Sequence, residues 1–280
     1  MANTCDSKSH GLVPCGFDSH LRHYNFGIII YMKLNFVIDK NYLIKHTLTC
    51  AEHNLFSSDK NKKDVLDFNR YALKQSSKCY DFLVGTFSPS DINEKNLKSF
   101  IKSINDELPK FLNEVKCSKE FKKIYSQTEK YLKFCEEQWN KNYEKTIKIV
   151  EKLIGFKLNK TFTVYITHPS QRNGSYWGNN KISWGVNEKW KNYTVIYLWH
   201  EILHSYFDDS NSDHVIIELI TDEELRNKLN KTKYPPFEGH KALTKLKKEF
   251  LPYWKKYLKS KDKNIKKFRK EAKKLLLYRT

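Results

Sequence analysis

The feature that most constrains the fold is a change of hydrophobic period near the middle of the chain. From residue 60 to about residue 155, apolar side chains recur at the spacing of amphipathic helices, and the pattern stops at Gly155, a residue type that commonly ends helices. Residues 161–167, TFTVYIT, instead alternate and are rich in β-branched side chains, which indicates a strand. Helices and strands are therefore segregated along the chain, and the sequence predicts an α+β fold.

Shorter patterns on either side add detail to that prediction. Residues 32–39, MKLNFVID, alternate apolar and polar side chains and indicate an early strand. Residues 175–186, SYWGNNKISWGV, predict a hairpin with two asparagines at its tip. We expect two helices after it, at about 193–207 and 214–229, separated by a polar turn.

Composition and pattern divide the chain into four regions. Residues 1–31 show no clear period, and we expect a leader that is disordered or is not translated, with translation starting at Met32; a cloning remnant is the alternative. The other regions are a strand followed by a mainly helical part at 32–157, an α+β part at 158–235 and a basic helical part at 236–280.

The net charge of +19 is concentrated near the carboxyl end. Residues 241–279 hold 16 Lys or Arg and three acids, which accounts for +13 of the total. Such a tail is compatible with nucleic-acid binding, but only six of the 51 basic residues are Arg, the residue that dominates base and phosphate recognition. The sequence therefore does not favour a nucleic-acid partner.

The cysteines and the apolar runs bear on the compartment. The six cysteines are scattered and form no C-x-x-C pair, which is typical of reduced thiols and not of a disulfide framework. No apolar run approaches the length of a membrane span, so we expect no transmembrane segment. Together these features predict a cytoplasmic protein. A more local expectation is that His168, which precedes Pro169 in loop-like sequence, is exposed.

The segment YLWHEILHSYF carries the clearest chemical motif, His200-Glu201-x-x-His204. Histidines four residues apart on a helix point the same way, so their ring nitrogens can converge on one zinc ion. The carboxylate of Glu201 is rotated away from that row and can serve as a general base without ligating the metal. The residues around the motif are uncharged, as expected for a helix buried beneath a cleft.

A catalytic zinc usually takes three protein ligands, so a further residue is needed. Glu218 lies within the apolar run VIIELI, where a carboxylate is costly unless it is paired or bound to a metal, and we take it as the predicted third ligand. His214, one helical turn earlier, and Asp208, which continues the row from His204, are alternatives. Asp222, one turn after Glu218, is predicted to orient a ligand imidazole.

The order H-E-x-x-H followed by E-x-x-x-D resembles the gluzincins, a group of zincin metallopeptidases. The resemblance implies a zincin-like catalytic region of a small sheet and an active-site helix, binding one Zn²⁺ through His200, His204 and Glu218, with Glu201 as general base and Asp222 bonded to His200. It also implies a strand upstream of the helix whose edge pairs with an extended peptide, a place that residues 180–186 occupy in this sequence. The interval between His204 and Glu218 is shorter than is typical of the best-known member.

These features predict a zinc-dependent hydrolase, a metallopeptidase that acts on a peptide or protein substrate through a metal-activated water. No motif identifies the group that stabilises the oxyanion, and His240 and Tyr234 are candidates by chemistry and position. Two alternatives stay open: a zinc-binding protein that is not a peptidase, and a basic helical module for nucleic acid or a protein partner in which the motif is incidental. The sequence indicates no oligomeric state.

Overall fold

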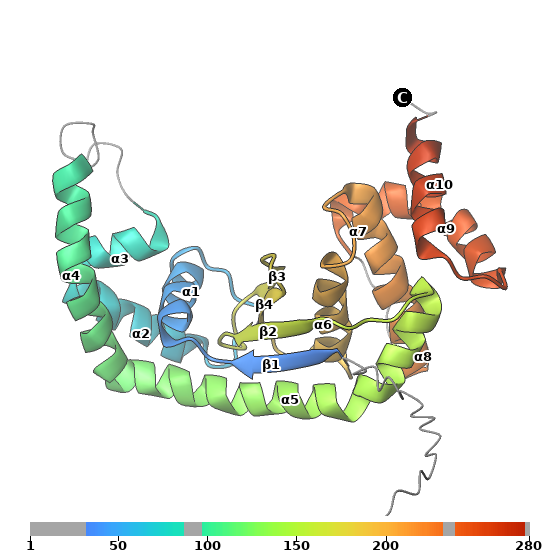
Figure 1. Ribbon diagram of the computed structural model, residues 1–280. Coiled ribbons are helices and arrows are strands. Elements are labelled where there is room, and N and C mark those ends of the chain that lie inside the picture. Colours follow the sequence, from blue (N-terminus) through green and yellow to red (C-terminus); the bar gives the residue numbers. More distant parts are fainter. Residues whose placement is uncertain (1–31, 87–96, 232–238, 278–280) are drawn as a thin grey trace, which may run out of the picture. The chain divides into compact units, whose positions relative to one another are not determined.

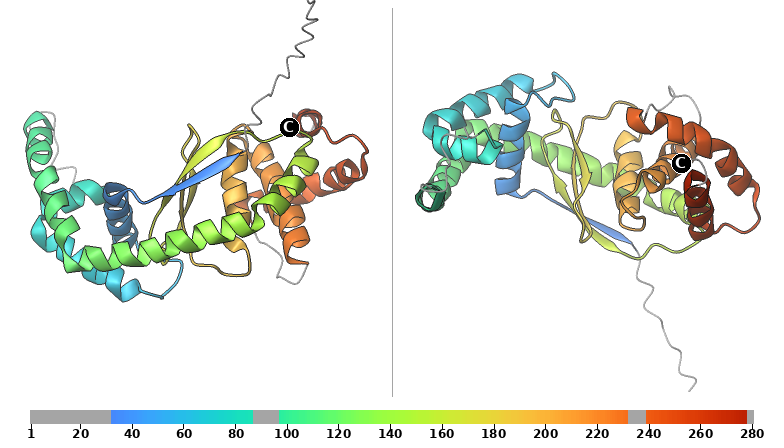
Figure 2. Two further views of the ribbon diagram at one scale, coloured as in Figure 1. Left: turned by 60° about the horizontal axis from the view of Figure 1, so that its bottom comes forward. Right: turned by 90° about the horizontal axis from the view of Figure 1, so that it is seen from above.

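A computed structural model describes residues 32–86, 97–231 and 239–277, and the leader predicted at residues 1–31 lies outside them. The described residues form an α+β fold, as predicted, in which a small sheet is packed by helices (Figure 1; two further views in Figure 2). Two clusters of buried apolar residues lie within it, one among the first helices and one around the sheet and the later helices.

The sheet has four strands in the order β1-β2-β4-β3. They are β1 (Lys33–Val37), β2 (Thr161–Ile166), β3 (Asn173–Tyr176) and β4 (Lys181–Gly185). β1 and β4 pair with β2 in parallel, and β3 pairs with β4 antiparallel. The early strand predicted from alternation is therefore confirmed, and it adds to a sheet whose other strands follow more than a hundred residues later.

The predicted hairpin is also confirmed. Asn179 and Asn180 both have positive φ, at 48° and 57°, as a two-residue turn of type I′ requires, and asparagine tolerates that conformation well. The expectation that residues 180–186 offer a free strand edge was wrong. β4 lies between β2 and β3 and is paired on both sides, so β3 is the strand at this end of the sheet.

The first helices enclose their own apolar core. They are α1 (Lys40–Glu52), α2 (Lys62–Gln75), α3 (Ser77–Val84) and α4 (Leu97–Cys117), together with the first turns of α5 (Lys119–Ile154). Leu43, Phe68 and Ile124 are among the side chains completely buried in this core. The amphipathic period of the sequence thus marks the side of each helix that faces its neighbours.

The long helix α5 takes part in both apolar cores. Phe121 and Ile124, near its start, belong to the first core, and Cys135 and Trp139, further along, belong to the core around the sheet. The helix ends at Gly155, whose φ of 80° is the left-handed conformation that glycine adopts without strain. This end was predicted from the sequence.

The second core is built by the sheet and the later helices. These are α6 (Tyr193–His204), α7 (Asn211–Glu218), the π-helical turn η1 (Leu219–Leu225), α8 (Arg226–Asn230), the short 3₁₀ helix η2 (Lys241–Leu243), α9 (Thr244–Lys259) and α10 (Ile265–Leu277). The two helices predicted after the hairpin are therefore present, but the second changes to a wider π-helical winding directly after Glu218.

The basic tail packs against this core. Ile265, Phe268 and Ala272 of α10 are buried, in line with the apolar face read from the sequence. Arg269 forms two hydrogen bonds of 2.7 and 2.8 Å with the carboxylate of Asp213, a completely buried residue at the start of α7. Burial alone would raise the pKa of Asp213, but the hydrogen bonds from Arg269 and Lys273 lower it. Part of the positive charge of the tail therefore holds α7 in place.

The described part of the chain also bears on the expected compartment. Its four cysteines, Cys50, Cys79, Cys117 and Cys135, are all free thiols. None of the helices in these residues combines the length and the apolar character that crossing a bilayer would require.

His168 is completely buried, so its expected exposure was wrong. Its Nε2 lies 2.8 Å from Oε1 of Gln127 in α5, and its Nδ1 lies 2.7 Å from the hydroxyl of Ser170. These bonds fit a neutral imidazole with its proton on Nε2, because the amide oxygen can only accept. Burial lowers the pKa of His168 to about 4.

This buried imidazole predicts acid sensitivity of the fold. The pKa of His168 is about 4 in the folded protein, which is below the ordinary value of 6.5, so the unfolded chain binds more protons between these two pH values. Its contribution is fully present above about pH 6.5 and is lost as pH falls toward 4, by up to about 3 kcal/mol. Urea unfolding at pH 7, 5.5 and 4 should show a smaller loss for His168→Gln than for the wild type.

Substitution of the exposed His53 by Gln is the matched control for that experiment. The His53→Gln protein should lose as much stability on acidification as the wild type. An unchanged pH dependence in His168→Gln would contradict the assignment of a neutral buried imidazole at this position.

Candidate metal centre

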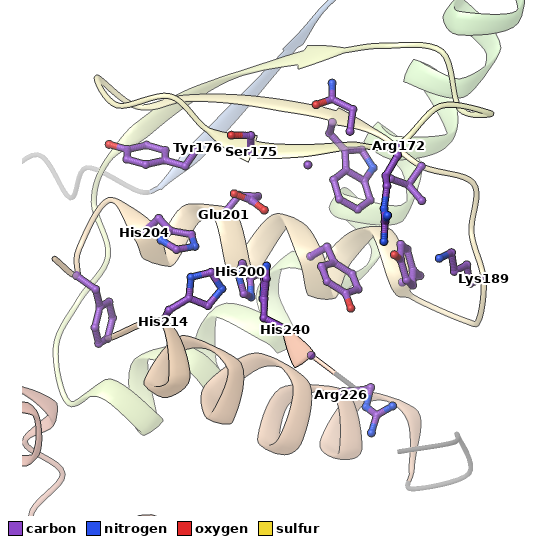
Figure 3. Close-up of a pocket in the computed structure, with 18 of the residues that line it drawn as sticks. Arg172, Ser175, Tyr176, Lys189, His200, Glu201, His204, His214, Arg226 and His240 are labelled. Carbon is purple, nitrogen blue, oxygen red and sulfur yellow. The ribbon is translucent and has the colours of Figure 1, made fainter. Parts of the chain in front are cut away.

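Helix α6 positions the H-E-x-x-H motif and is buried on nearly every side. Leu198, Trp199, Ile202 and Leu203 have no exposed surface, and Trp199 contacts Trp139 of α5 with ring centroids 5.2 Å apart. Such a helix can place polar side chains only where its neighbours leave an opening. His200 and His204, one turn apart, line this opening (Figure 3).

Three histidines converge there. His200, His204 and His214 each offer a ring nitrogen, and these three atoms lie within 4.8 Å of one another. His214 comes from α7, and its ring centroid is 5.0 Å from that of His200 and 4.8 Å from that of His204. Figure 3 shows the three rings turned toward one space between the two helices.

The state of these imidazoles fits a metal-binding role. Burial, reinforced by the neighbouring histidines, lowers the pKa of His200 well below its ordinary value and that of His204 to about 4. The pKa of His214 is lowered for the same reasons. All three rings are therefore neutral at pH 7 and keep a lone pair for a ligand. Nε2 of His214 is buried without a hydrogen-bond partner among the described residues, which leaves it available to a metal ion.

Glu201 lies on the side of α6 that faces the sheet, between the histidines and β3 (Figure 3). Its side chain is nearly buried, and burial raises its pKa to about 7, although a hydrogen bond from the backbone of Tyr176 acts in the opposite direction. A carboxyl group with a pKa near 7 can both accept and donate a proton at neutral pH. Its proximity to the three histidines is the arrangement that the motif predicts.

Glu218 is engaged with His240. The carboxylate accepts a hydrogen bond of 2.9 Å from the backbone N–H of His240, and Nδ1 of the same residue lies 2.9 Å from the same oxygen. Burial would raise the pKa of Glu218, but these bonds and the ammonium group of Lys247 lower it. The hydrogen bond to Glu218 correspondingly raises the pKa of His240. Gly239 permits this contact, since a Cβ there would lie 2.6 Å from the carboxylate.

The predicted ligands fall into two overlapping groups of potential metal-binding residues. Within the described residues, Glu218 forms a potential metal-binding group with His214 and His240, whereas His200 and His204 are grouped with His214. His214, considered as an alternative third ligand, is common to both groups. Asp208, the other alternative, is largely exposed and pairs with Arg269 and Lys273.

Asp222 occupies an unexpected environment. Its side chain is completely buried, both carboxylate oxygens lack a hydrogen-bond partner among the described residues, and burial raises its pKa well above the ordinary value. The hydrogen bond predicted between Asp222 and His200 is not formed here, since Nδ1 of His200 is also without a partner. The π-helical winding after Glu218 explains the difference, because it rotates Asp222 out of the α-helical register that the prediction assumed.

The histidines and Glu201 line a cavity of about 940 Å³. His240, a predicted oxyanion-stabilising residue, lines it too, and its ring centroid is 4.4 Å from that of His214. Tyr234, the other candidate, lies outside the described residues. β3 forms one wall with Gly174, Ser175 and Tyr176, so the end strand of the sheet runs beside Glu201.

The cavity also contains residues that the sequence analysis did not single out. Among them are three cations, Arg172, Lys189 and Arg226, and three aromatic residues, Trp190, Tyr193 and Tyr197. A signal for the two tyrosines was present, because Tyr193, Tyr197 and His204 recur at the spacing of one helical face. The cations come from three separate segments, and no local spacing connects them.

Comparison of the chain with protein-family models, with curated proteins and with solved structures gives no match.

The geometry predicts which residue completes a three-ligand site. Replacing His214 by Ala should lower zinc affinity more than about 100-fold, because it removes one of three convergent nitrogens. Replacing Glu218 by Gln should lower it less, because that carboxylate is bonded to His240. Competition of each purified variant with a chromogenic zinc chelator, next to the wild type, gives the two affinities.

A larger loss of zinc affinity in Glu218→Gln than in His214→Ala would support the third ligand predicted from the sequence. If Glu218→Gln loses zinc and His214→Ala retains it, then Glu218 is the third ligand. Asp209→Asn serves as a control, since this exposed acid lines the same cavity but belongs to neither potential metal-binding group.

Proposed function

We propose that this protein is a zinc-dependent peptidase. The observation that carries the proposal is the convergence of three neutral histidines beside a buried glutamate whose pKa is raised to about 7. Either feature alone has simpler explanations, since buried histidines and acids occur in many cores. Together, in one cavity, they form the set of groups that metal-assisted hydrolysis requires.

His200, His204 and His214 would hold the ion through their ring nitrogens, with Glu218 kept as the alternative third ligand. A zinc ion bound there supplies Lewis acidity, which polarises a carbonyl group and makes a water molecule acidic enough to attack at neutral pH. The donor set supports zinc, because neutral imidazole is one of its preferred ligands.

Glu201 is proposed as the group that moves the proton. Its carboxylate accepts a proton from the attacking water and then delivers it to the amine that leaves, so the residue ends the cycle in its starting state. Burial raises the pKa of Glu201, and a zinc ion bound beside it would lower that pKa again, so the carboxylate would be present to accept the proton. The buried surroundings of Glu201 limit the access of other water.

The strand β3 is proposed to bind the substrate backbone. Only one side of β3 is paired within the described sheet, and Gly174 and Tyr176 of this strand line the cavity next to Glu201. An extended peptide can add to such an edge through main-chain hydrogen bonds and so bring one carbonyl group toward the site. This role replaces the one that the sequence analysis gave to residues 180–186.

His240 is proposed to stabilise the oxyanion. The hydrogen bond to Glu218 raises the pKa of His240 and so favours its protonated form, a better hydrogen-bond donor than neutral imidazole. Glu218 in this arrangement holds the imidazole in position beside the metal-binding histidines. We further propose a cytoplasmic location, for which the free thiols of the described residues are the support.

Glu201→Gln tests the reaction. The amide keeps the size of the side chain but cannot accept the proton, so peptide cleavage should fall by about 10²- to 10⁴-fold while zinc binding is retained. Cleavage is measured by mass spectrometry on a proteome-derived peptide library, and zinc by elemental analysis. Glu137→Gln, on an exposed face of α5, is the matched control and should cleave like the wild type.

Each alternative has its own outcome in the same experiment. A wild-type protein that binds zinc stoichiometrically but cleaves no peptide indicates a zinc protein with another role. A protein that binds no zinc after metal-replete expression contradicts the proposal and leaves a basic module for nucleic acid or a protein partner.

A further inference from the structure

One end of the cavity is lined by positive charge. Arg172 precedes β3, Lys189 precedes α6 and Arg226 begins α8, and all three line the cavity that contains Glu201. Figure 3 shows them gathered at the end away from His204 and Tyr176. Segments that are distant in sequence thus bring their cations to the same place.

The cations surround a wall of aromatic rings. Lys189 Nζ lies 5.9 Å from the ring centroid of Tyr193, and the guanidinium carbon of Arg226 lies 5.8 Å from that of Trp190. The rings of Tyr193 and Trp190 are themselves in contact, with centroids 5.0 Å apart. Burial and the nearby carboxylate of Asp222 raise the pKa of Tyr193, while the positive charge of Arg172 acts on the same hydroxyl in the opposite direction. The three cations therefore lie around the same part of the cavity, next to the rings of Tyr193 and Trp190.

The acids near this end are either bonded elsewhere or buried. Among the described residues, neither Arg172 nor Lys189 forms an ion pair with a carboxylate. Glu188, the nearest acid in sequence to Lys189, directs its carboxylate to the backbone N–H groups of Tyr193 and Thr194 at the start of α6. The buried Asp222 has a raised pKa, which favours its uncharged form.

We propose that this end of the cavity, which we call the basic pocket (Arg172, Lys189 and Arg226), binds a carboxylate group of the substrate. The statement that the substrate is a peptide rests on the proposed function. The carboxylate can belong to an acidic side chain or to the carboxyl terminus of the peptide, because the guanidinium group of Arg172 recognises both alike. The aromatic wall packs against the apolar part of the residue that carries it.

Helix α6 gives the distance between the basic pocket and the bond that is proposed to be cleaved near Glu201. Tyr197 and Tyr193 precede Glu201 by one and two turns of α6, which is about 6 to 12 Å along the helix axis. An extended peptide advances about 3.3 Å per residue. The recognised carboxylate therefore lies about two to four residues from the bond that is cleaved.

A peptide fits this cavity better than a nucleic acid. The exposed carboxylate of Asp209 lines the same cavity and would repel a continuous phosphate backbone, whereas a peptide brings one local negative charge to the basic pocket. The end strand β3 along the wall also matches the hydrogen bonds of a peptide backbone.

Direct binding tests the pocket without relying on cleavage. The Glu201→Gln protein, loaded with zinc, is titrated with fluorescent dodecapeptides of Ala and Ser that carry one central Glu or Gln, each with a free or an amidated carboxyl terminus. At 50 mM salt, fluorescence anisotropy should show about 10-fold tighter binding of a peptide that has the recognised carboxylate. Preference for Glu in the amidated pair identifies the side chain, and preference for the free terminus in the Gln pair identifies the chain end.

Substitutions then assign the preference to the pocket. Arg172→Gln and Lys189→Gln, both at exposed positions, are introduced together into the Glu201→Gln protein. They should reduce its preference for the carboxylate-bearing peptide to within about 2-fold. Adding Lys191→Gln instead removes a nearby exposed charge that does not line the cavity and should leave the preference intact. The proposal is overturned if all four peptides bind equally, if the double substitution keeps the preference, or if a single-stranded oligothymidine binds more tightly than every peptide.

The same measurements separate the two proposals. A wild-type protein that cleaves no peptide, while its carboxylate preference depends on Arg172 and Lys189, rejects the peptidase function and retains the basic pocket. The other outcome is a wild type that cleaves the library with no enrichment of Asp, Glu or a chain end within four residues of the cut. That result retains the peptidase function and rejects the basic pocket.

Discussion

The whole arrangement depends on the burial of α6. A helix that carries two histidines and a glutamate yet is surrounded by α5, the sheet and α7 must direct those polar groups into one opening, because desolvating them elsewhere would be costly. That opening is the cavity between α7 and β3. The packing of Trp199 and its apolar neighbours therefore helps to position the polar residues of the site.

Much of the fold follows from local sequence information. The helical period before Gly155, the alternation at residues 161–167 and the two asparagines at the hairpin tip each reflect a preference of the residues themselves. Local spacing likewise places His200, Glu201 and His204 on one helix. The order of the strands could not be read in this way, since β1 joins β2 across more than a hundred residues and β3, not β4, ends the sheet.

The rest of the site depends on contacts that no spacing encodes. The position of His214 depends on how α7 docks, and α7 is held by the ion pair between Asp213 and Arg269, which are 56 residues apart in sequence. The place of Asp222 depends on a π-helical winding that an α-helical projection does not include. His168 was misjudged for a similar reason, because its partner Gln127 comes from α5.

The electrostatics of the cavity follow from a single cause acting on different groups. Burial lowers the pKa of the histidines and raises that of Glu201, and in both cases it favours the uncharged form. The centre is therefore close to neutral, with the basic pocket at one end and, on the other side, His240, whose pKa is raised by its hydrogen bond to Glu218. The net charge of +19 thus says little about this site, because much of that charge lies on the tail and only a few cations reach the cavity. The proposed preference for a substrate carboxylate therefore depends on these few residues and not on the overall charge of the chain.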